Sequence, residues 1–475
     1  MKQNKFKILA GILISLFILI RIISLGPDIS NSDAARWHRR SIMFLNALKR
    51  GDFAETYQRY HPGVTLMWLN SFVKQASFSY QLTYTKTPKT LENADYYPIQ
   101  HGISKGVNII VLAVLLGFQI YGLEKVFNKK TALIYAFLIS LEPYMVGINR
   151  WFHQTSFEVF FGFTAVLFIL IWNKEKKNLQ IALSAVFLAL SILSKVTSLV
   201  LIPVFAYYLL KTKKIKPALI FFSTLALTIF AVFPALWVKP VYVLSQIYSA
   251  VTSAVGSGSV SIFYYFIILA FKLSPVTLLI FVVSLINLKK IRNENILAFL
   301  GTLLIYLLFL TISRKKIDRY SLAMIPYILT VSSFYLTKTS IKAFKIILIS
   351  ATIFFIYISI IYHPVYSAYY SPFFGGAKKA LDLGVYENSG EYFAQAAFYL
   401  NGKSRNMLVY IPDNIESFNY YYKGNVENIL EKEPDYIVSS LDKDRKSDND
   451  LQKCGQLDKT FGPGGFNAVY VYKCN

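Results

Sequence analysis

Cysteine and acidic residues are scarce in this sequence. Its 475 residues contain 26 Asp and Glu against 50 Lys and Arg, and the two cysteines, Cys454 and Cys474, both lie in a polar C-terminal tail. Two cysteines exclude a disulfide-rich scaffold and a cysteine-based metal cluster, although they could form one disulfide if the tail lies outside the cytosol. The few acids leave a divalent-metal site possible but unsupported, so no metal ligands and no cofactor are predicted.

Motifs of soluble enzymes are also missing. No P-loop, GxSxG, HExxH or CxxC pattern occurs in a suitable context, and no Rossmann fingerprint follows a strand, so soluble-type nucleotide-sugar or ATP chemistry is unsupported. The net charge of +24 could indicate a nucleic-acid binder. The basic residues lie at the ends of apolar runs and form no single stripe, which argues against nucleic acid as a partner.

Apolar runs of about 20 residues dominate the first three quarters of the chain, and hydrophobic residues make up 55% of the whole. Separated by short Lys-rich segments, these runs are typical of a polytopic membrane protein. The first run lacks a small-residue cleavage site and is predicted to be an uncleaved signal anchor. Eleven spans are predicted, near residues 7–25, 101–122, 131–148, 156–172, 178–194, 196–210, 217–236, 268–288, 295–312, 320–337 and 343–362.

Lys and Arg are unevenly divided between the two sides of this arrangement. With the N-terminus in the cytosol, the N-terminal lysines and the internal linkers carry nineteen Lys and Arg, and the four short external linkers carry about seven. The bias predicts a multi-pass plasma-membrane protein with a cytoplasmic N-terminus and an extracytoplasmic C-terminus. One external linker, SRKKIDRY, breaks the rule: it is either a tolerated exception, a miscount of spans or an anion site that faces outward.

Two predicted external loops, 26–100 and 238–267, are too long to be simple connectors. The first contains ARWHRRSIMFLNALKRGDF, in which apolar residues such as Ile42, Leu45 and Leu48 recur every three to four positions. This spacing predicts helices that lie on the membrane surface. The second loop is rich in Gly and Ser and is predicted to be more flexible.

The composition becomes polar after His363. A helical run, NSGEYFAQAAFYLN, is followed by the strand-like runs MLVYI, DYIVSS and AVYVYK, which Pro, Gly and Asn separate. The predicted fold class is therefore an all-α membrane domain of about eleven transmembrane helices, residues 1–363, followed by a small external α/β domain, residues 364–475.

Several ionisable residues map to the outer side of the predicted spans. Charged groups at membrane depth are costly, so they are candidates for a functional site. Such a site would combine one or two carboxylates with cations able to hold phosphate beside lipid, which suits a donor that is itself a lipid phosphate. The candidates are Asp33, His61, Glu142, Arg150, His153, Lys195, Arg314, Lys315, Lys316 and Arg319.

Structural interpretations of these residues remain open at this point. Glu142 and Arg150 could form an ion pair that joins two helices. Lys195 lies between two apolar runs and could simply extend to the membrane interface. His61 precedes a Pro-Gly pair, where a structural role is common, and Asp33 could cap the helix that follows it.

In order and spacing, a series of segments resembles the multi-spanning C-type glycosyltransferases that use polyprenyl-phosphate sugars, especially the dolichyl-phosphate-mannose protein mannosyltransferase and aminoarabinose transferase group. The resemblance covers most of the chain, and no single segment is diagnostic. The segments are SDAARW, GDFAETYQRYHPGVTLMWL, EPYMVGINRWFHQTS, LSKVTSLVLIP, FPALWVKP, SRKKIDRYSLAMIP and YYSPFFGGAKKALDLGVYENSGEYFAQAAFYLN.

The resemblance implies roles for individual residues. Asp33 would be the catalytic base toward an acceptor hydroxyl, although many members carry two adjacent acids and here Ala34 follows. Glu142 matches an acid that precedes Pro at the end of the third span, and Arg150 matches a turn arginine that contacts the donor phosphate. Further donor-phosphate contacts would come from Lys195, Arg314, Lys315 and Arg319, with His61, Glu142 and His153 in support.

The implied reaction is an inverting transfer of a monosaccharide from a polyprenyl-phosphate donor to a hydroxyl of a protein, lipid or glycan acceptor at the outer face. The main alternative is a transporter or flippase for a lipid-linked sugar. The sequence shows no inverted repeat and no pair of Gly/Pro-broken spans in matching halves, which argues against a transporter.

Overall fold

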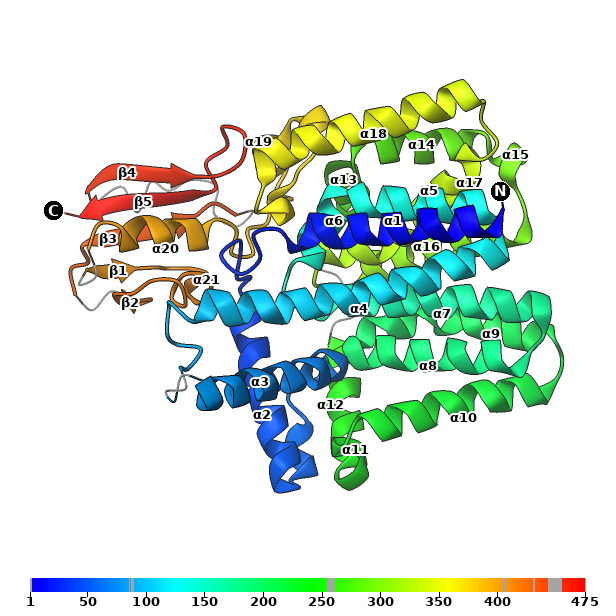
Figure 1. Cartoon of the computed structure of the whole chain (residues 1–475), viewed down its shortest axis with the longest axis horizontal. Coiled ribbons are helices and arrows are strands. Elements are labelled where there is room, and N and C mark those ends of the chain that lie inside the picture. The colour runs from blue at the N-terminus through cyan, green and yellow to red at the C-terminus, as the bar shows by residue number, and fades with distance from the viewer. Residues whose placement is uncertain are drawn as a thin grey trace.

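Long helices that run side by side form most of the molecule. The computed structural model describes residues 2–84, 86, 89–253, 261–404, 407–429, 432–442 and 455–474. Figure 1 shows the long helices aligned with the longest axis, the C-terminal sheet at one end and the N-terminus at the other.

Helices occupy every predicted apolar run, but five of the runs are not single α-helices. Run 131–148 bends by 70° between α5 and α6, and runs 196–210 and 320–337 begin as 3₁₀ helices. Run 217–236 is interrupted after Val232, and run 268–288 divides between α13 and α14. The bundle consists of α1 (Gln3–Ile22), α4 (Tyr97–Val126), α5 (Lys129–Leu141), α6 (Pro143–Asn149), α7 (Thr155–Glu175), α8 (Asn178–Ser194), η2 (Val196–Leu201), α9 (Ile202–Lys211), α10 (Ile215–Val232), α13 (Tyr264–Lys272), α14 (Pro275–Ile286), α15 (Leu288–Ile291), α16 (Glu294–Ile312), η3 (Asp318–Met324), α17 (Ile325–Leu336) and α18 (Ile341–Tyr362).

Five of the described helices, α4, α7, α10, α16 and α18, are long and apolar enough to cross a membrane, and the bent α5–α6 pair could make a sixth. Three shorter apolar stretches lie at 178–194, 196–211 and 275–286. The chain is therefore an integral membrane protein, and the number of eleven spans stays a prediction.

Helix α7 is the centre of the bundle. Its apolar window is entirely buried within the protein, whereas that of α10 is only 6% buried. Because apolar surface that no protein covers suits lipid, α10 belongs to the periphery and α7 to the core. The turn that precedes α7 contains Arg150 and His153, and because α7 is central, both side chains are buried in the interior of the molecule.

The first long loop contains α2 (Ala34–Arg50), η1 (Phe53–Thr56) and α3 (Val64–Tyr84), and α2 confirms the predicted helix. Figure 1 shows α2 lying across the direction of α1 and α4. Its fully buried face is formed by Trp37, His38, Ser41, Phe44 and Ala47, whereas the apolar residues used for the prediction are only half-buried. The sequence missed this face because it contains a histidine and a serine, which find partners only in the folded protein.

The second long loop contains α11 (Ala235–Val238) and α12 (Pro240–Ser253). Residues 254–260, which include the glycines behind the predicted flexibility, lie outside the described residues.

The C-terminal part contains a five-stranded mixed sheet with the strand order β2-β1-β3-β5-β4. Strand β1 runs parallel to β2 and β3, and β5 runs antiparallel to β3 and β4. The elements are η4 (Tyr366–Ala368), η5 (Pro372–Phe374), α19 (Gly376–Asp382), α20 (Phe393–Asn401), α21 (Ile415–Phe418), β1 (Leu408–Tyr410), β2 (Asn425–Glu427), β3 (Tyr436–Ser440), β4 (Gly455–Phe461) and β5 (Val469–Cys474).

Three predicted strands correspond to β1, β3 and β5, and the predicted helix corresponds to α20, which begins five residues later than its run. Strands β2 and β4 were not recognised from sequence because both are polar edge strands, each of which pairs with one neighbour only. The disulfide that the two cysteines could form would include Cys454, which lies outside the described residues.

The C-terminal part is docked on the start of the first long loop. The Tyr421 hydroxyl donates to the carbonyl of Gly26 at 2.6 Å, and the Gln395 amide donates to the carbonyl of Asp28 at 2.8 Å. The N–H of Ser32 donates to the carbonyl of Ser389 at 2.9 Å. The segment that leads to Asp33 is therefore held between the bundle and the sheet.

Candidate functional site

Asp33 stands at the beginning of α2, and its carboxylate faces three basic side chains. The Arg319 guanidinium donates to Oδ2 at 3.0 Å, His153 Nε2 lies 3.6 Å from the same oxygen, and Arg36 lies 3.8 Å from Oδ1. The Asp33 side chain makes no capping hydrogen bond to α2, although it occupies the N-cap position. Its carboxylate is 25% exposed and is therefore within reach of a ligand.

His153 is oriented toward Asp33 by the turn that contains it. Its Nδ1 accepts the backbone N–H of Thr155 at 3.2 Å, so in the neutral ring the proton is on Nε2, the atom that faces Asp33. Burial lowers the pKa of His153 to about 4, and the positive charge of Arg319 acts in the same direction while Asp33 opposes it. At neutral pH, His153 is thus an uncharged donor beside the carboxylate.

The pKa of Asp33 lies below its usual range. Burial raises it, but the approach of the His153 ring and the positive charges of Arg319 and Arg36 outweigh that effect. Asp33 is therefore ionised at neutral pH and ready to accept a proton, while its intrinsic basicity is reduced.

The basic loop before α17 delivers one of its cations to Asp33. Arg319 contacts the carboxylate, whereas Arg314 and Lys315 are exposed and Lys316 Nζ donates to the carbonyl of Thr311 at 2.7 Å. A neighbouring buried ion pair, Lys272 Nζ to Asp318 Oδ2 at 3.1 Å, fixes the start of η3. Arg319 follows Asp318 directly and is held in place by that pair.

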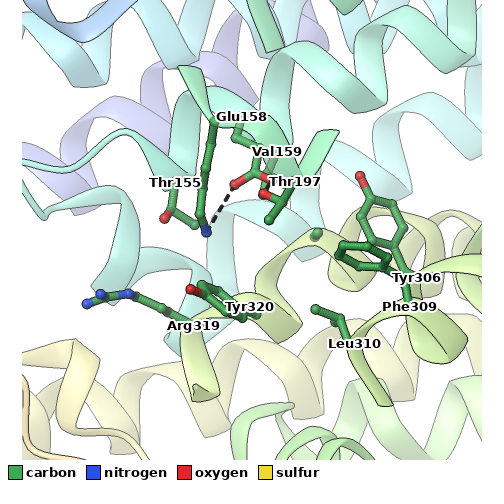
Figure 2. A pocket seen from close by; sticks show the side chains of 11 residues that line it. Thr155, Glu158, Val159, Thr197, Tyr306, Phe309, Leu310, Arg319 and Tyr320 are labelled. Atoms are coloured by element: carbon green, nitrogen blue, oxygen red, sulfur yellow. Dashed lines mark hydrogen bonds and ion pairs between the residues drawn. The ribbon is translucent and has the colours of Figure 1, made fainter. Parts of the chain in front are cut away.

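Lys195 and Arg319 line the same small pocket. Figure 2 shows Arg319 and Tyr320 on one side of it and Glu158 and Thr197 on the other. Lys195 Nζ is 3.5 Å from Glu158 Oε2 and 4.0 Å from the centre of the Tyr320 ring, and the Thr197 hydroxyl donates to Glu158. The pocket volume of about 10 Å³ is close to that of one water molecule. The pocket also contains Thr155, Val159, Tyr306, Phe309, Leu310 and Ala323.

His61 joins this group through the turn before α3. The N–H of Gly63 donates to the carbonyl of Ser194 at 3.2 Å, which ties the turn to the residue before Lys195. Gly63 has a φ of +57°, and a Cβ there would lie 2.2 Å from the Trp37 ring, so only glycine fits. Burial and the positive charge of Lys195 lower the pKa of His61 to about 2, which keeps its ring neutral.

Arg150 lies outside this cluster, and its two terminal nitrogens bind the end of α1 and the segment after it, while its buried Nε has no hydrogen-bond partner among the described residues. Its guanidinium donates to the carbonyl of Ile23 at 2.7 Å and to Asp28 Oδ2 at 2.9 Å, and it also reaches the carbonyls of Arg21 and Ser24. Asp28 is further paired with Lys105 Nζ at 2.6 Å, and all three charged side chains are buried.

Glu142 is also separate from the cluster. It accepts the N–H of Ser274 at 2.6 Å and the Thr277 hydroxyl at 2.6 Å, so it caps the N-terminus of α14. Among the described residues, the Glu142 to Arg150 ion pair that the sequence left open is not formed. Glu142 therefore supports the break between α5 and α6.

The sequence interpretation did not select several charged residues that shape the site, among them Asp28, Asp318 and Lys272. Asp318 lies within SRKKIDRY, which was selected for its basic residues, and Asp28 lies five positions before Asp33; this proximity was the available signal. Lys272 ends α13 inside an apolar run, where a lysine could have been questioned. In the described part of the chain, no three His, Cys, Asp or Glu side chains lie close enough to hold a metal ion.

Part of the chain matches the sequence model of a known family. Residues 106–237, from α4 to α11, match the sequence model of the dolichyl-phosphate-mannose-protein mannosyltransferase family. This region includes Arg150, His153, Glu158 and Lys195. No match was found among curated protein sequences.

Two solved structures share the fold. The crystal structure of ArnT from Cupriavidus metallidurans in the apo state matches with a TM-score of 0.55 at 11% identity, over 97% of each chain. The structure of the same protein bound to undecaprenyl phosphate matches with a TM-score of 0.53 at 12% identity, over 86% of this chain and 74% of that chain. The resemblance recognised in the sequence segments is thereby confirmed.

Proposed function

We propose that this chain, which belongs to the multi-spanning C-type glycosyltransferases that use polyprenyl-phosphate substrates, transfers a monosaccharide from a polyprenyl-phosphate donor to an acceptor hydroxyl with inversion. One observation carries the proposal: the ionised Asp33 and the cations Arg319 and Lys195 lie around one site at the same end of the bundle. A carboxylate base and a phosphate-binding cation pair are the two parts that this reaction needs.

In the proposed reaction, Asp33 accepts the proton of the acceptor hydroxyl while that oxygen forms a bond to the anomeric carbon of the sugar. The bond between this carbon and the phosphate oxygen breaks, and the polyprenyl phosphate leaves with the electron pair. General-base assistance contributes about 10² to 10⁴ in rate. His153 and Arg319 orient the carboxylate, which offsets part of the basicity that the lowered pKa removes.

Arg319 and Lys195 stabilise the leaving group in this proposal. Negative charge grows on the lipid phosphate as the glycosidic bond breaks, so fixed cations in a partly dry site favour the transition state over the bound donor. Lys195 can turn from Glu158 toward the phosphate, because 3.5 Å is a loose ion pair. Exposed Arg314 and Lys315 stay proposed donor contacts at the mouth of the site.

A second pocket supports a long lipid chain as part of the donor. Its volume is about 690 Å³, and it lies between α9 and α16, with Pro203, Tyr207 and Gly301 among its lining residues. The catalytic pocket is lined by Tyr306, Phe309 and Leu310 of the same helix α16. The two pockets follow one another along α16, so an isoprenoid chain can extend from the phosphate along this groove.

Arg150 is proposed to be a positioning residue instead of a direct phosphate ligand. Four of its five N–H donors, those of the two terminal nitrogens, serve one carboxylate and three carbonyls of residues 21–28, and only the buried Nε–H is left without a partner. By holding this segment it fixes the approach to Asp33. We further propose that the N-terminus is cytoplasmic and that Asp33 and the C-terminal sheet are extracytoplasmic, as the distribution of Lys and Arg predicts.

The proposal is tested with the full chain purified in nanodiscs and a panel of polyprenyl-phosphate monosaccharides. We expect at least one donor to lose its sugar, to an added hydroxyl acceptor or slowly to water, and Asp33→Asn to abolish this reaction. Asp52→Asn, an exposed acid of the same loop, is the matched control. Absence of turnover with every donor, or full activity of Asp33→Asn, would contradict the proposal. Sugar-lipid flipping that survives Asp33→Asn would support a transporter.

A further inference from the structure

Three arginines of the first two turns of α2, the helix that begins after Asp33, form a group with Arg59, and we name the group the arginine patch: Arg36, Arg39, Arg40 and Arg59. The first three lie three and four residues apart on α2 and therefore share a face of that helix. Arg59 is the fourth member, because it lies close enough to Arg40 for its positive charge, together with burial, to lower the pKa of Arg40. Arg36, Arg39 and Arg59 are exposed.

Acidic residues do not balance this charge. Arg36 is shared between Asp33 at 3.8 Å and Glu416 at 3.1 Å, and Asp33 also forms an ion pair with Arg319. Arg39 contacts the Tyr420 hydroxyl, and Arg59 lies over the Tyr60 ring. Within the described ranges, neither Arg39 nor Arg59 has a carboxylate partner, so the arginine patch carries a positive surplus.

The position of the patch argues for a substrate rather than for membrane headgroups. Glu416 and Tyr420 belong to the C-terminal part, so Arg36 and Arg39 face the space between α2 and α21. Figure 1 shows α21 beside the upper end of α2, at the end of the bundle nearest the sheet. An arginine that served only to hold lipid headgroups would have no reason to contact the C-terminal part or the carboxylate of Asp33.

Arginine also defines the chemistry of the partner. Its planar guanidinium forms two parallel hydrogen bonds to a phosphate or carboxylate. Clustered arginines together produce a positive potential that attracts multiply charged anions. A phosphate group offers three oxygens and up to two negative charges, which suits several arginines at once. A neutral glycan or hydroxyl peptide would gain nothing from the patch.

We propose that the acceptor is a phosphate-bearing glycan, whose phosphate groups bind the arginine patch and thereby place a neighbouring hydroxyl against Asp33. This inference rests on the proposed function and names its acceptor class. The hydroxyl loses its proton to Asp33 and the donor phosphate leaves, as described above. The bound phosphate of the acceptor takes no part in the bond changes.

A binding experiment tests this without the donor, so its failure is separate from a failure of sugar transfer. The full chain in phosphatidylcholine nanodiscs is titrated with a phosphorylated mannan oligosaccharide, with its dephosphorylated form and with an acidic glutamate peptide of equal charge. We expect the phosphorylated oligosaccharide to bind tightest. Arg39→Gln and Arg59→Gln, which do not contact Asp33, should each weaken it by about two- to fivefold, as for an exposed ion pair.

Arg50→Gln is the matched control, because Arg50 is exposed on the last turn of α2, about 20 Å along the helix from Arg36. It should bind as the wild type does. Equal binding of the phosphorylated and dephosphorylated oligosaccharides, or unchanged binding by both patch variants, overturns the proposal. Tighter binding of the acidic peptide overturns it in favour of an acidic protein acceptor. Loss of oligosaccharide binding by the wild type in phosphatidylglycerol nanodiscs, with a smaller loss for Arg39→Gln, overturns the proposal in favour of lipid headgroups at the patch.

Discussion

Arg319 donates a hydrogen bond to Asp33 at 3.0 Å across a sequence separation of 286 residues. The contact joins the first long loop to the basic loop before α17, and it places Arg319, a proposed ligand of the donor phosphate, on Asp33, the proposed base. Acid and cation are therefore positioned relative to each other before either substrate binds, which lowers the cost of organising the reaction.

Asp33→Asn should reduce sugar transfer by about 10² to 10⁴, because the amide cannot accept the proton. Its stability effect should depend on pH. The lowered pKa means that the carboxylate stabilises the fold above about pH 4, where it is also ionised in the unfolded chain, and loses this contribution as the pH falls. Transfer assays and thermal unfolding at pH 7 and pH 4 measure both. If the wild type exceeded the variant in stability by more at pH 4 than at pH 7, the expected pH dependence would be wrong.

Arg319→Gln should lower the transfer rate by about 10² to 10³, as expected for one lost transition-state donor. Arg314→Gln is the comparison within the same loop: because Arg314 is exposed and does not contact Asp33, its loss should lower the rate less. Initial rates at saturating donor measure the difference. If both variants lose the same activity, the loop acts through its net charge and the contact with Asp33 has no special role.

Arg150→Met should impair folding more than chemistry. The change leaves Asp28 buried with one cation instead of two and three carbonyls without a donor, and breaking a buried pair costs about 3 to 5 kcal/mol. The melting temperature in detergent measures the loss, with Arg50→Met as the exposed control. The folded fraction should keep the wild-type KM for the donor. A normal melting temperature with a large rise in that KM would instead make Arg150 a phosphate ligand.

Gly301→Leu should block the groove along α16. A Cβ at Gly301 meets nothing within 4 Å, so the backbone tolerates the change while the side chain fills space in the pocket. We expect KM to rise about tenfold for a long-chain donor and to stay unchanged for a donor with one or two isoprene units. Gly11→Leu, another open helical position, is the control. An equal effect on short and long donors would exclude the groove as the lipid site.

Lys74→Met should stabilise the protein at low pH. Burial in α3 lowers the pKa of Lys74 to about 7, and Nζ has no hydrogen-bond partner among the described residues. The unfolded chain therefore binds more protons between pH 7 and about pH 10, so wild-type stability should rise with pH across that window. Below pH 7 the lysine costs on the order of 4 kcal/mol, which methionine removes.

Unfolding at pH 6 and pH 9 measures this effect, with exposed Lys49→Met as the control. A gain for Lys74→Met that is larger at pH 9 than at pH 6 would contradict the expected linkage.

The candidate site was only partly accessible to sequence reasoning. Asp33, His153, Lys195 and Arg319 were selected because charged groups near membrane depth are rare, and the structure brings them together with His61. Arg150 was selected by the same rule, yet its charge serves Asp28. The rule identifies residues that need a partner and does not identify the partner.

The sequence by itself determined the apolar runs, the surface helix α2 and the strands β1, β3 and β5, because hydropathy and periodicity are local properties that add along the chain. The tertiary structure decided which cation reaches which acid. Ion pairs depend on distance and burial in three dimensions, so Arg319 contacts Asp33 and Arg314 does not, although the two arginines are only five positions apart in the sequence.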